Sequence, residues 1–139
     1  MKYKEFDKLI TAMSKENDSD DYWYDVGVND AADLLKKFSE DDWELLENNI
    51  MDKLIKWQKR VVYCFEGENN AREINIILSL IETMDKELFE ICIDSLRFLI
   101  NDNNKGYIIN NNELMKKLRK VSLIDNISGM ICRDFLNKL

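Results

Sequence analysis

The sequence of 139 residues contains no histidine and no proline, and its glycines are Gly27, Gly67, Gly106 and Gly129. The lack of histidine excludes Ser–His and Cys–His catalytic pairs and histidine metal ligands. The glycines are too far apart for a phosphate-binding loop, and the cysteines are too far apart for a paired zinc motif. Because residues that break helices are scarce, we expect helices, with three of the four glycines near their junctions.

The sequence also lacks a signal peptide, a lipidation motif and an apolar run of about 18 residues. Its three cysteines, Cys64, Cys92 and Cys132, are widely spaced, and each falls on an apolar helical face. This usage is typical of reduced, buried cysteines in a cytosolic protein. We therefore predict a cytoplasmic protein that does not act at a membrane.

The most apolar stretch, residues 71–101, predicts two consecutive helices joined by a short turn at residues 83–85. The Asp85 carboxylate is expected to cap the second helix by accepting its free backbone N–H groups. Both helices are apolar nearly all round, which is typical of helices buried by several neighbours. We expect these side chains to face inward: Ile74, Ile76, Ile77, Leu78, Leu80, Ile81 and Met84, then Leu88, Phe89, Ile91, Cys92, Ile93, Leu96, Leu99 and Ile100.

Most of the remaining sequence shows apolar residues at steps of three or four, the spacing of an amphipathic helix. Ser39 is expected to cap a long helix that runs to about Phe65, with Leu54 on its inward stripe. Asn29 or Asp30 is expected to cap a short helix that precedes the long one. The polar residues 16–29 predict either a loop or a loop with one short turn, and residues 101–112 predict a polar connection. Further helices are expected over residues 2–15, 31–38 and 113–121, and one or two helices over residues 123–139.

These elements predict an all-α protein that forms a single domain over residues 1–139. Consecutive helices with short turns favour antiparallel helical pairs. Such pairs can stack as a short right-handed solenoid or close into an α-bundle. The sequence pattern leaves both arrangements open.

Within residues 39–101, the order of the elements resembles HEAT-type helical repeats. A leucine-bearing helix with Leu78 and Leu80 is followed by Asp85 and by a helix with Leu88, Cys92 and Leu96. Arg97 stands late in the second helix, as in such repeats, whereas the proline common in their first helix is missing. The layout, with Trp43 and Trp57 on a preceding helix, is also similar to small all-α immunity proteins of bacterial polymorphic-toxin and contact-dependent growth inhibition systems. The resemblance implies a HEAT-like protein that binds and neutralises a cognate toxin domain.

The net charge of −7 is concentrated in one part of the chain. Residues 16–47 contain twelve acidic side chains against Lys36 and Lys37, a net charge of −10, whereas the remaining residues carry +3. Such acidity disfavours nucleic acid as a partner and favours a basic protein. Tyr22, Trp23 and Tyr24 lie within this acidic part, and aromatic residues beside charge are typical of interface hot spots.

We therefore predict two partner-binding segments. The first comprises Asp20, Asp21, Tyr22, Trp23 and Asp25; the second is a polar stripe on one helix face and comprises Glu87, Glu90, Asp94 and Arg97. Alternative interpretations are solvated surface for both segments, an acid–base pair within the stripe, and a cation site at the acidic residues 18–21. The acidic residues 18–21 do not match the spacing of an EF-hand loop, so we expect no metal and no cofactor.

The leading functional hypothesis is a cytoplasmic immunity protein without enzymatic activity, which blocks a basic toxin domain such as a nuclease. The alternative is a HEAT-like adaptor or scaffold subunit in a protein assembly. A small enzyme is the third hypothesis. The sequence pattern does not indicate an oligomeric state.

Overall fold

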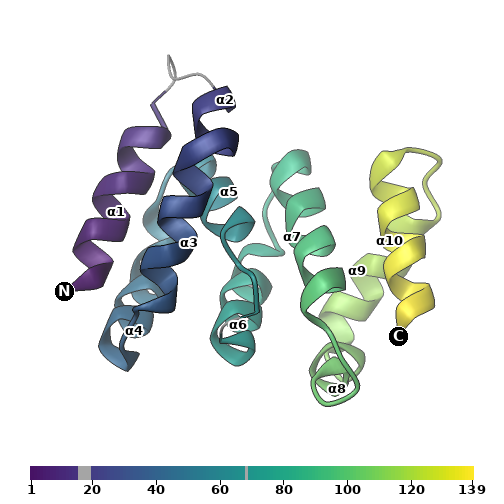
Figure 1. The fold of residues 1–139 in the computed structure, drawn as a ribbon. Helices are drawn as coiled ribbons and strands as arrows, with labels where there is room; N and C mark the ends of the chain where they lie inside the picture. Colours follow the sequence, from purple (N-terminus) through teal and green to yellow (C-terminus); the bar gives the residue numbers. More distant parts are fainter. Residues whose placement is uncertain (16–19, 68) are drawn as a thin grey trace. The chain divides into compact units, whose positions relative to one another are not determined.

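The computed structural model describes residues 1–15, 20–67 and 69–139, and every regular element within these ranges is a helix (Figure 1). This confirms the all-α prediction. The chain divides into two compact units, residues 1–79 and residues 80–139, here called unit 1 and unit 2. A single domain that spans the whole chain stays a prediction, and each unit is described by itself.

Unit 1 is built around the first helix. Its elements are α1 (Lys2–Met13), α2 (Asp20–Tyr22), the π-helical η1 (Trp23–Gly27), α3 (Val28–Lys36), α4 (Glu40–Asn49), the 3₁₀-helical η2 (Ile50–Asp52), α5 (Ile55–Tyr63) and α6 (Asn70–Leu80), whose last residue falls in unit 2. Helix α1 packs against α3, α4 and α5. The buried Phe6 ring makes edge contacts with Phe38 and Trp57, at centroid distances of 5.4 and 6.1 Å. Aromatic residues therefore fill the centre of this unit.

The start of α4 was correctly predicted. The Ser39 hydroxyl accepts a hydrogen bond from the Asp42 backbone N–H at 3.2 Å, and the Asp42 carboxylate accepts one from the Ser39 N–H at 2.9 Å. Asp42 also accepts from the backbone N–H of Tyr3 at 3.0 Å, which joins the start of α1 to α4. Burial opposes the ionisation of Asp42, but these hydrogen bonds outweigh it and lower the pKa of its carboxyl.

The predicted loop over residues 16–29 is wrong for its described part. The backbone is helical without interruption from Asp20 to Lys36, so Asn29 and Asp30 lie inside a helix and do not cap it. Tertiary packing explains the difference, since Trp23 is fully buried and holds a polar sequence in helical form. Gly27 also lies inside this helix. The packing favours glycine at this position, because a Cβ there would lie 2.9 Å from the Trp23 ring.

The predicted long helix over residues 39–65 is also wrong, because it breaks after η2. Lys53 and Leu54 are extended, and α5 begins afresh at Ile55. Leu54 is 76% exposed, although the helical pattern placed it on the inward stripe. The buried Gln58 amide donates to the Ile50 carbonyl oxygen at 2.9 Å, which satisfies a backbone group near the break.

Unit 2 contains α7 (Lys86–Leu99), α8 (Lys105–Ile109), α9 (Asn112–Ser122) and α10 (Ile127–Lys138), and α10 packs against both α7 and α9. Asp85 caps α7 as predicted, accepting from the Leu88 backbone N–H at 2.8 Å. The short helix α8 replaces part of the expected connection and buries Ile108. The core is mainly aliphatic and includes Leu88, Cys92, Ile93, Leu96, Leu114, Leu118, Ile131 and Phe135.

The two central helices of the sequence analysis are present as α6 and α7, but they are assigned to different units. Their pairing as one central element therefore stays a prediction. Most of their expected inward residues are buried, whereas Leu78 is only half-buried and Met84 is 99% exposed. Met84 lies outside both helices, which removes it from the helical stripe that the sequence predicted.

The three cysteines are buried and unpaired, as expected. Burial raises the pKa of the Cys92 thiol to about 12 and that of Cys132 to about 11, and it raises the pKa of Cys64 further. They therefore stay protonated at neutral pH. Within the described ranges, the helices lack the combination of length and apolar character that spanning a membrane requires.

Candidate functional site

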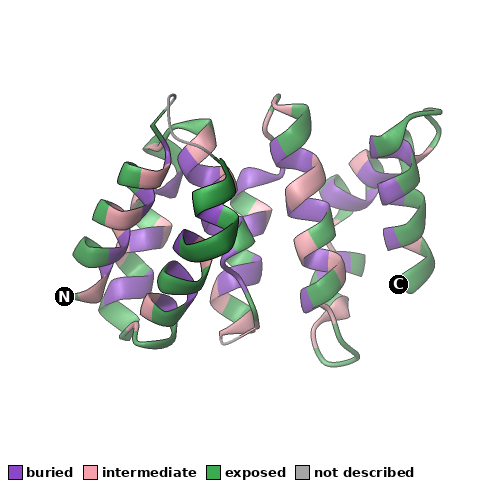
Figure 2. Ribbon diagram, turned by 45° about the horizontal axis from the view of Figure 1, so that its top comes forward, coloured by how far each residue is buried: buried purple, intermediate pink, exposed green. Residues whose placement is uncertain are grey.

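The first predicted segment lies on one continuous helical run, Asp20–Lys36, which we call the acidic helix. Its buried face carries Trp23, Gly27, Ala31, Ala32 and Leu35. The opposite side is exposed and carries Asp21, Tyr22, Tyr24, Asp25, Val26, Asn29, Asp30 and Asp33 (Figure 2). The acidic helix thus presents carboxylates and two tyrosines on a backbone that is fixed from behind.

A π-helical turn at η1 positions the aromatic residues of this run. Such turns place one extra residue in a helical turn and are frequent at functional sites. At this turn Trp23 is fully buried, while Tyr22 and Tyr24, on either side of it, are about half exposed. Gly27 lies close to both Trp23 and Met13, so the run packs tightly at this turn.

Arg60 of α5 anchors the start of the acidic helix. Its guanidinium Nη2 donates to Asp20 Oδ1 at 2.6 Å, and its Cζ lies 4.9 Å from the Trp23 ring centroid and 6.0 Å from that of Tyr24. The Arg60 side chain is only 5% exposed, so its charge is compensated by Asp20 and by the two ring faces. A buried cation therefore holds the aromatic turn in place.

Asp20 is consequently engaged within unit 1. The hydrogen bond from Arg60 and the charges of Arg60 and, at 3.9 Å, Lys56 hold the pKa of Asp20 below its usual range. Its role as a partner contact stays a prediction, but its charge already neutralises an internal cation. Asp21 and Asp25 are exposed neighbours that extend the acidic surface beyond this ion pair.

The expectation that Trp23 stands at the front of this surface is corrected. Its side chain is 0% exposed, so it supports the acidic helix from inside and is not part of the exposed surface. Tyr63 of α5 takes a surface position that sequence reasoning missed: its ring meets that of Tyr24 edge to face at 5.7 Å. The signal for Tyr63 was its place beside the inward stripe of α5, but only the fold brings it next to Tyr24.

The second predicted segment, on α7, is tied into unit 2. Glu90 accepts a hydrogen bond from the Ser128 hydroxyl of α10 at 2.6 Å. Arg97 pairs with Asp94 at 2.7 Å and reaches Asp134 of α10 at 3.7 Å. The stripe thus helps to hold α10 against α7. Glu87 is exposed at the start of α7, and contact of this stripe with a partner stays a prediction.

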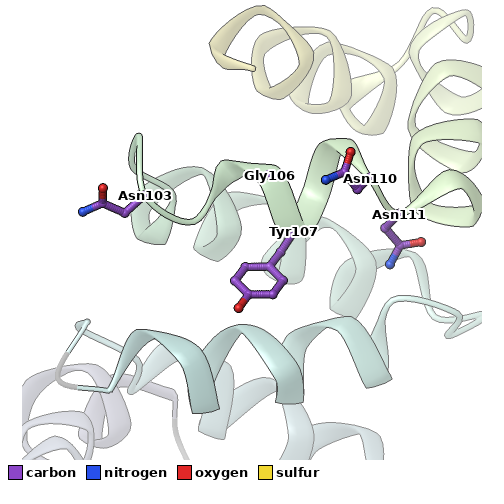
Figure 3. A pocket seen from close by; sticks show the side chains of 5 residues that line it. All are labelled: Asn103, Gly106, Tyr107, Asn110 and Asn111. Atoms are coloured by element: carbon purple, nitrogen blue, oxygen red, sulfur yellow. The ribbon is translucent and has the colours of Figure 1, made fainter.

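A hollow of about 590 Å³ beside α8 is lined by Asn103, Gly106, Tyr107, Asn110 and Asn111. Figure 3 shows that these side chains do not converge on one point. The lining holds amides and one phenol, and no charged group, so it suggests no reaction. It was not anticipated from the sequence beyond the abundance of asparagine there.

No metal centre is found in the part of the chain that the structure describes, where no three potential ligand side chains gather. The acidic residues 18–21 considered for a cation lie partly outside the described ranges. The absence of a cofactor therefore stays a prediction.

Compared with protein-family models, with curated proteins and with solved structures, the chain matches none.

Proposed function

We propose that the protein is an immunity protein that binds and neutralises a basic toxin domain through the acidic helix. The proposal includes a HEAT-like arrangement of antiparallel helical pairs and action in the cytoplasm, without enzymatic activity. An inhibitor of this kind needs a rigid surface that complements its target, and it needs no catalytic group.

The observation that carries the proposal is the two-sided character of the acidic helix. Trp23 and Arg60 fix its inner side, while Tyr22, Tyr24, Asp21 and Asp25 face solvent. A fixed backbone lowers the entropy lost on binding, and tyrosines supply contact area beside carboxylates that attract a cation.

Charge distribution adds a second argument. Residues 1–79 contain 18 acidic and 11 basic side chains, whereas residues 80–139 contain nine of each, so unit 1 carries the whole net charge of −7. A basic toxin domain is attracted to unit 1, and this attraction speeds association at low salt.

The test uses the purified protein and the product of the gene next to its own, if that product is toxic when expressed alone. Asp25→Lys is expected to slow association and to reduce its dependence on salt. Tyr24→Ala is expected to raise Kd by about 10-fold or more, mainly through faster dissociation. The matched control is Asp102→Lys, the same charge change at a fully exposed position in unit 2.

Circular dichroism must show that each variant is folded. Equal binding by wild type and by a folded Asp25→Lys, Tyr24→Ala double variant would reject the acidic helix as the binding surface. Failure of the neighbouring protein to bind, together with stable copurification of other subunits, would favour the adaptor hypothesis instead.

A further inference from the structure

The corner between α9 and α10 exposes four large apolar side chains, Leu123, Ile124, Ile127 and Met130, which we call the apolar corner. Leu123 is 86% exposed and Ile127 is 63% exposed, and the turn between the helices is exposed throughout (Figure 2). Single exposed apolar residues are common, but four between positions 123 and 130 are a feature of interaction surfaces.

The apolar corner is held rigidly. Asn126 caps α10 by accepting from the Gly129 backbone N–H at 2.7 Å, and Arg133 donates to the carbonyl oxygens of Ser122 and Ile124 at 2.8 and 3.2 Å. Gly129 allows the turn to close, because a Cβ there would lie 1.8 Å from the Ile124 carbonyl oxygen. The exposed side chains are therefore presented by an ordered turn, which favours binding because little conformational entropy is lost.

The charges near the apolar corner are mainly positive. Lys116, Arg119 and Lys120 are exposed on α9 in the two turns before it, and Arg133 is exposed on α10. Asp125 is the acidic residue of the turn itself. Two copies of this corner would repel each other, so its surroundings suit an acidic surface that also offers apolar side chains.

The acidic helix of the same protein has this composition, with Asp25, Asp30 and Asp33 exposed together with Tyr22, Tyr24 and Val26. We propose that the apolar corner of one molecule binds the acidic helix of a second molecule. The contact joins two different surfaces, so one molecule keeps its acidic helix unused and the other keeps its apolar corner unused, and association can continue beyond a dimer. The proposal goes beyond the toxin hypothesis and is tested on this chain alone, so either can fail without the other.

The first measurement is the average molecular mass of the wild type by light scattering or sedimentation over a wide range of protein concentration. We expect the mass to rise with concentration and to fall as salt is added, because opposite charges face each other in the contact. A monomeric mass at every concentration would overturn the proposal.

The second measurement uses two variants with complementary defects. Leu123→Glu, Ile127→Glu alters the apolar corner, and Asp25→Lys, Asp30→Lys alters the acidic helix; each is expected to be monomeric alone. Their mixture is expected to form a heterodimer that grows no further, because only one intact surface of each kind remains. The control is Phe98→Glu, which changes an apolar residue that is 71% exposed elsewhere in unit 2 and should leave association unchanged.

Circular dichroism and thermal melting must show that each variant is folded. If Leu123→Glu, Ile127→Glu unfolds, the single variant Ile127→Glu takes its place. Continued association of a folded corner variant would show that another surface is responsible. Continued association of the acidic-helix variant alone would show that the corner has a different occupant. Either outcome contradicts the proposal.

Discussion

The two units use different means to build a helical core. Unit 1 contains all three tryptophans and four of the five tyrosines, and it links its helices with ion pairs such as Lys53–Asp7 and Arg72–Glu47. Unit 2 is electrically neutral and depends more on leucine and isoleucine. Ion pairs also join helices in unit 2, as between Arg97 and Asp134, so the acidic character of the protein accompanies the aromatic core and not the use of ion pairs.

The exposed surfaces of the two units also differ in charge. Unit 1 exposes carboxylates with tyrosines on a helix anchored by a buried arginine. Unit 2 exposes aliphatic side chains beside lysine and arginine at the apolar corner. The same chain therefore carries two surfaces of opposite charge, each with apolar residues at its centre.

Removal of the ring at the centre of unit 1 is expected to have the largest effect. Phe6→Ala deletes a fully buried side chain between Phe38 and Trp57 and should cost about 3–5 kcal/mol. Denaturant unfolding followed by tryptophan fluorescence reports on unit 1 alone, because every tryptophan lies there. The exposed Phe98→Ala is the control and should cost less than about 0.5 kcal/mol.

In unit 2, Leu96→Ala should cost about 2–5 kcal/mol, because Leu96 is fully buried. Leu78→Ala, for which the sequence pattern suggests an equal cost, should cost less because Leu78 is half-buried. Unfolding followed by circular dichroism gives both values. Equal costs would mean that Leu78 is more enclosed than the structure shows.

Arg60→Met keeps much of the side-chain volume but removes the charge beside Asp20, Trp23 and Tyr24. We expect a loss of about 1–3 kcal/mol and a change in tryptophan fluorescence, because the cation–π contact to Trp23 is lost. Lys59→Met, one position earlier on α5, is the comparison. A fluorescence spectrum and stability like those of the wild type would show that Arg60 does not organise the aromatic turn.

The smallest expected effect is on the stability of the protein at low pH. Because Arg60 lowers the folded-state pKa of Asp20, the pair stabilises the protein above the usual aspartate pKa of 3.8, and this contribution is lost as pH falls through the lowered value. Asp20→Asn should therefore reduce stability slightly at neutral pH and converge with the wild type in acid. Melting temperatures from pH 7 down to about pH 2 check this. A difference that does not depend on pH would assign the effect of Asp20 to packing.

Local sequence rules predicted the caps of two helices correctly. Ser39 and Asp85 have short polar side chains that bind the backbone N–H group three residues ahead, so their role depends on neighbours in the chain. The candidate site was predicted less well. Asp25 and Tyr22 are exposed as expected, but Trp23 is buried and the supposed loop is a helix.

By itself, the sequence determined that this is an all-α protein with a strongly acidic segment, because helical periodicity and charge are local properties. The tertiary structure decided which aromatic residues are buried, where the long helix breaks at Lys53 and Leu54, and which carboxylate neutralises Arg60. Arg60 and Asp20 are 40 residues apart, and no local pattern pairs them. Such contacts depend on how distant helices pack, and packing is a property of the whole unit.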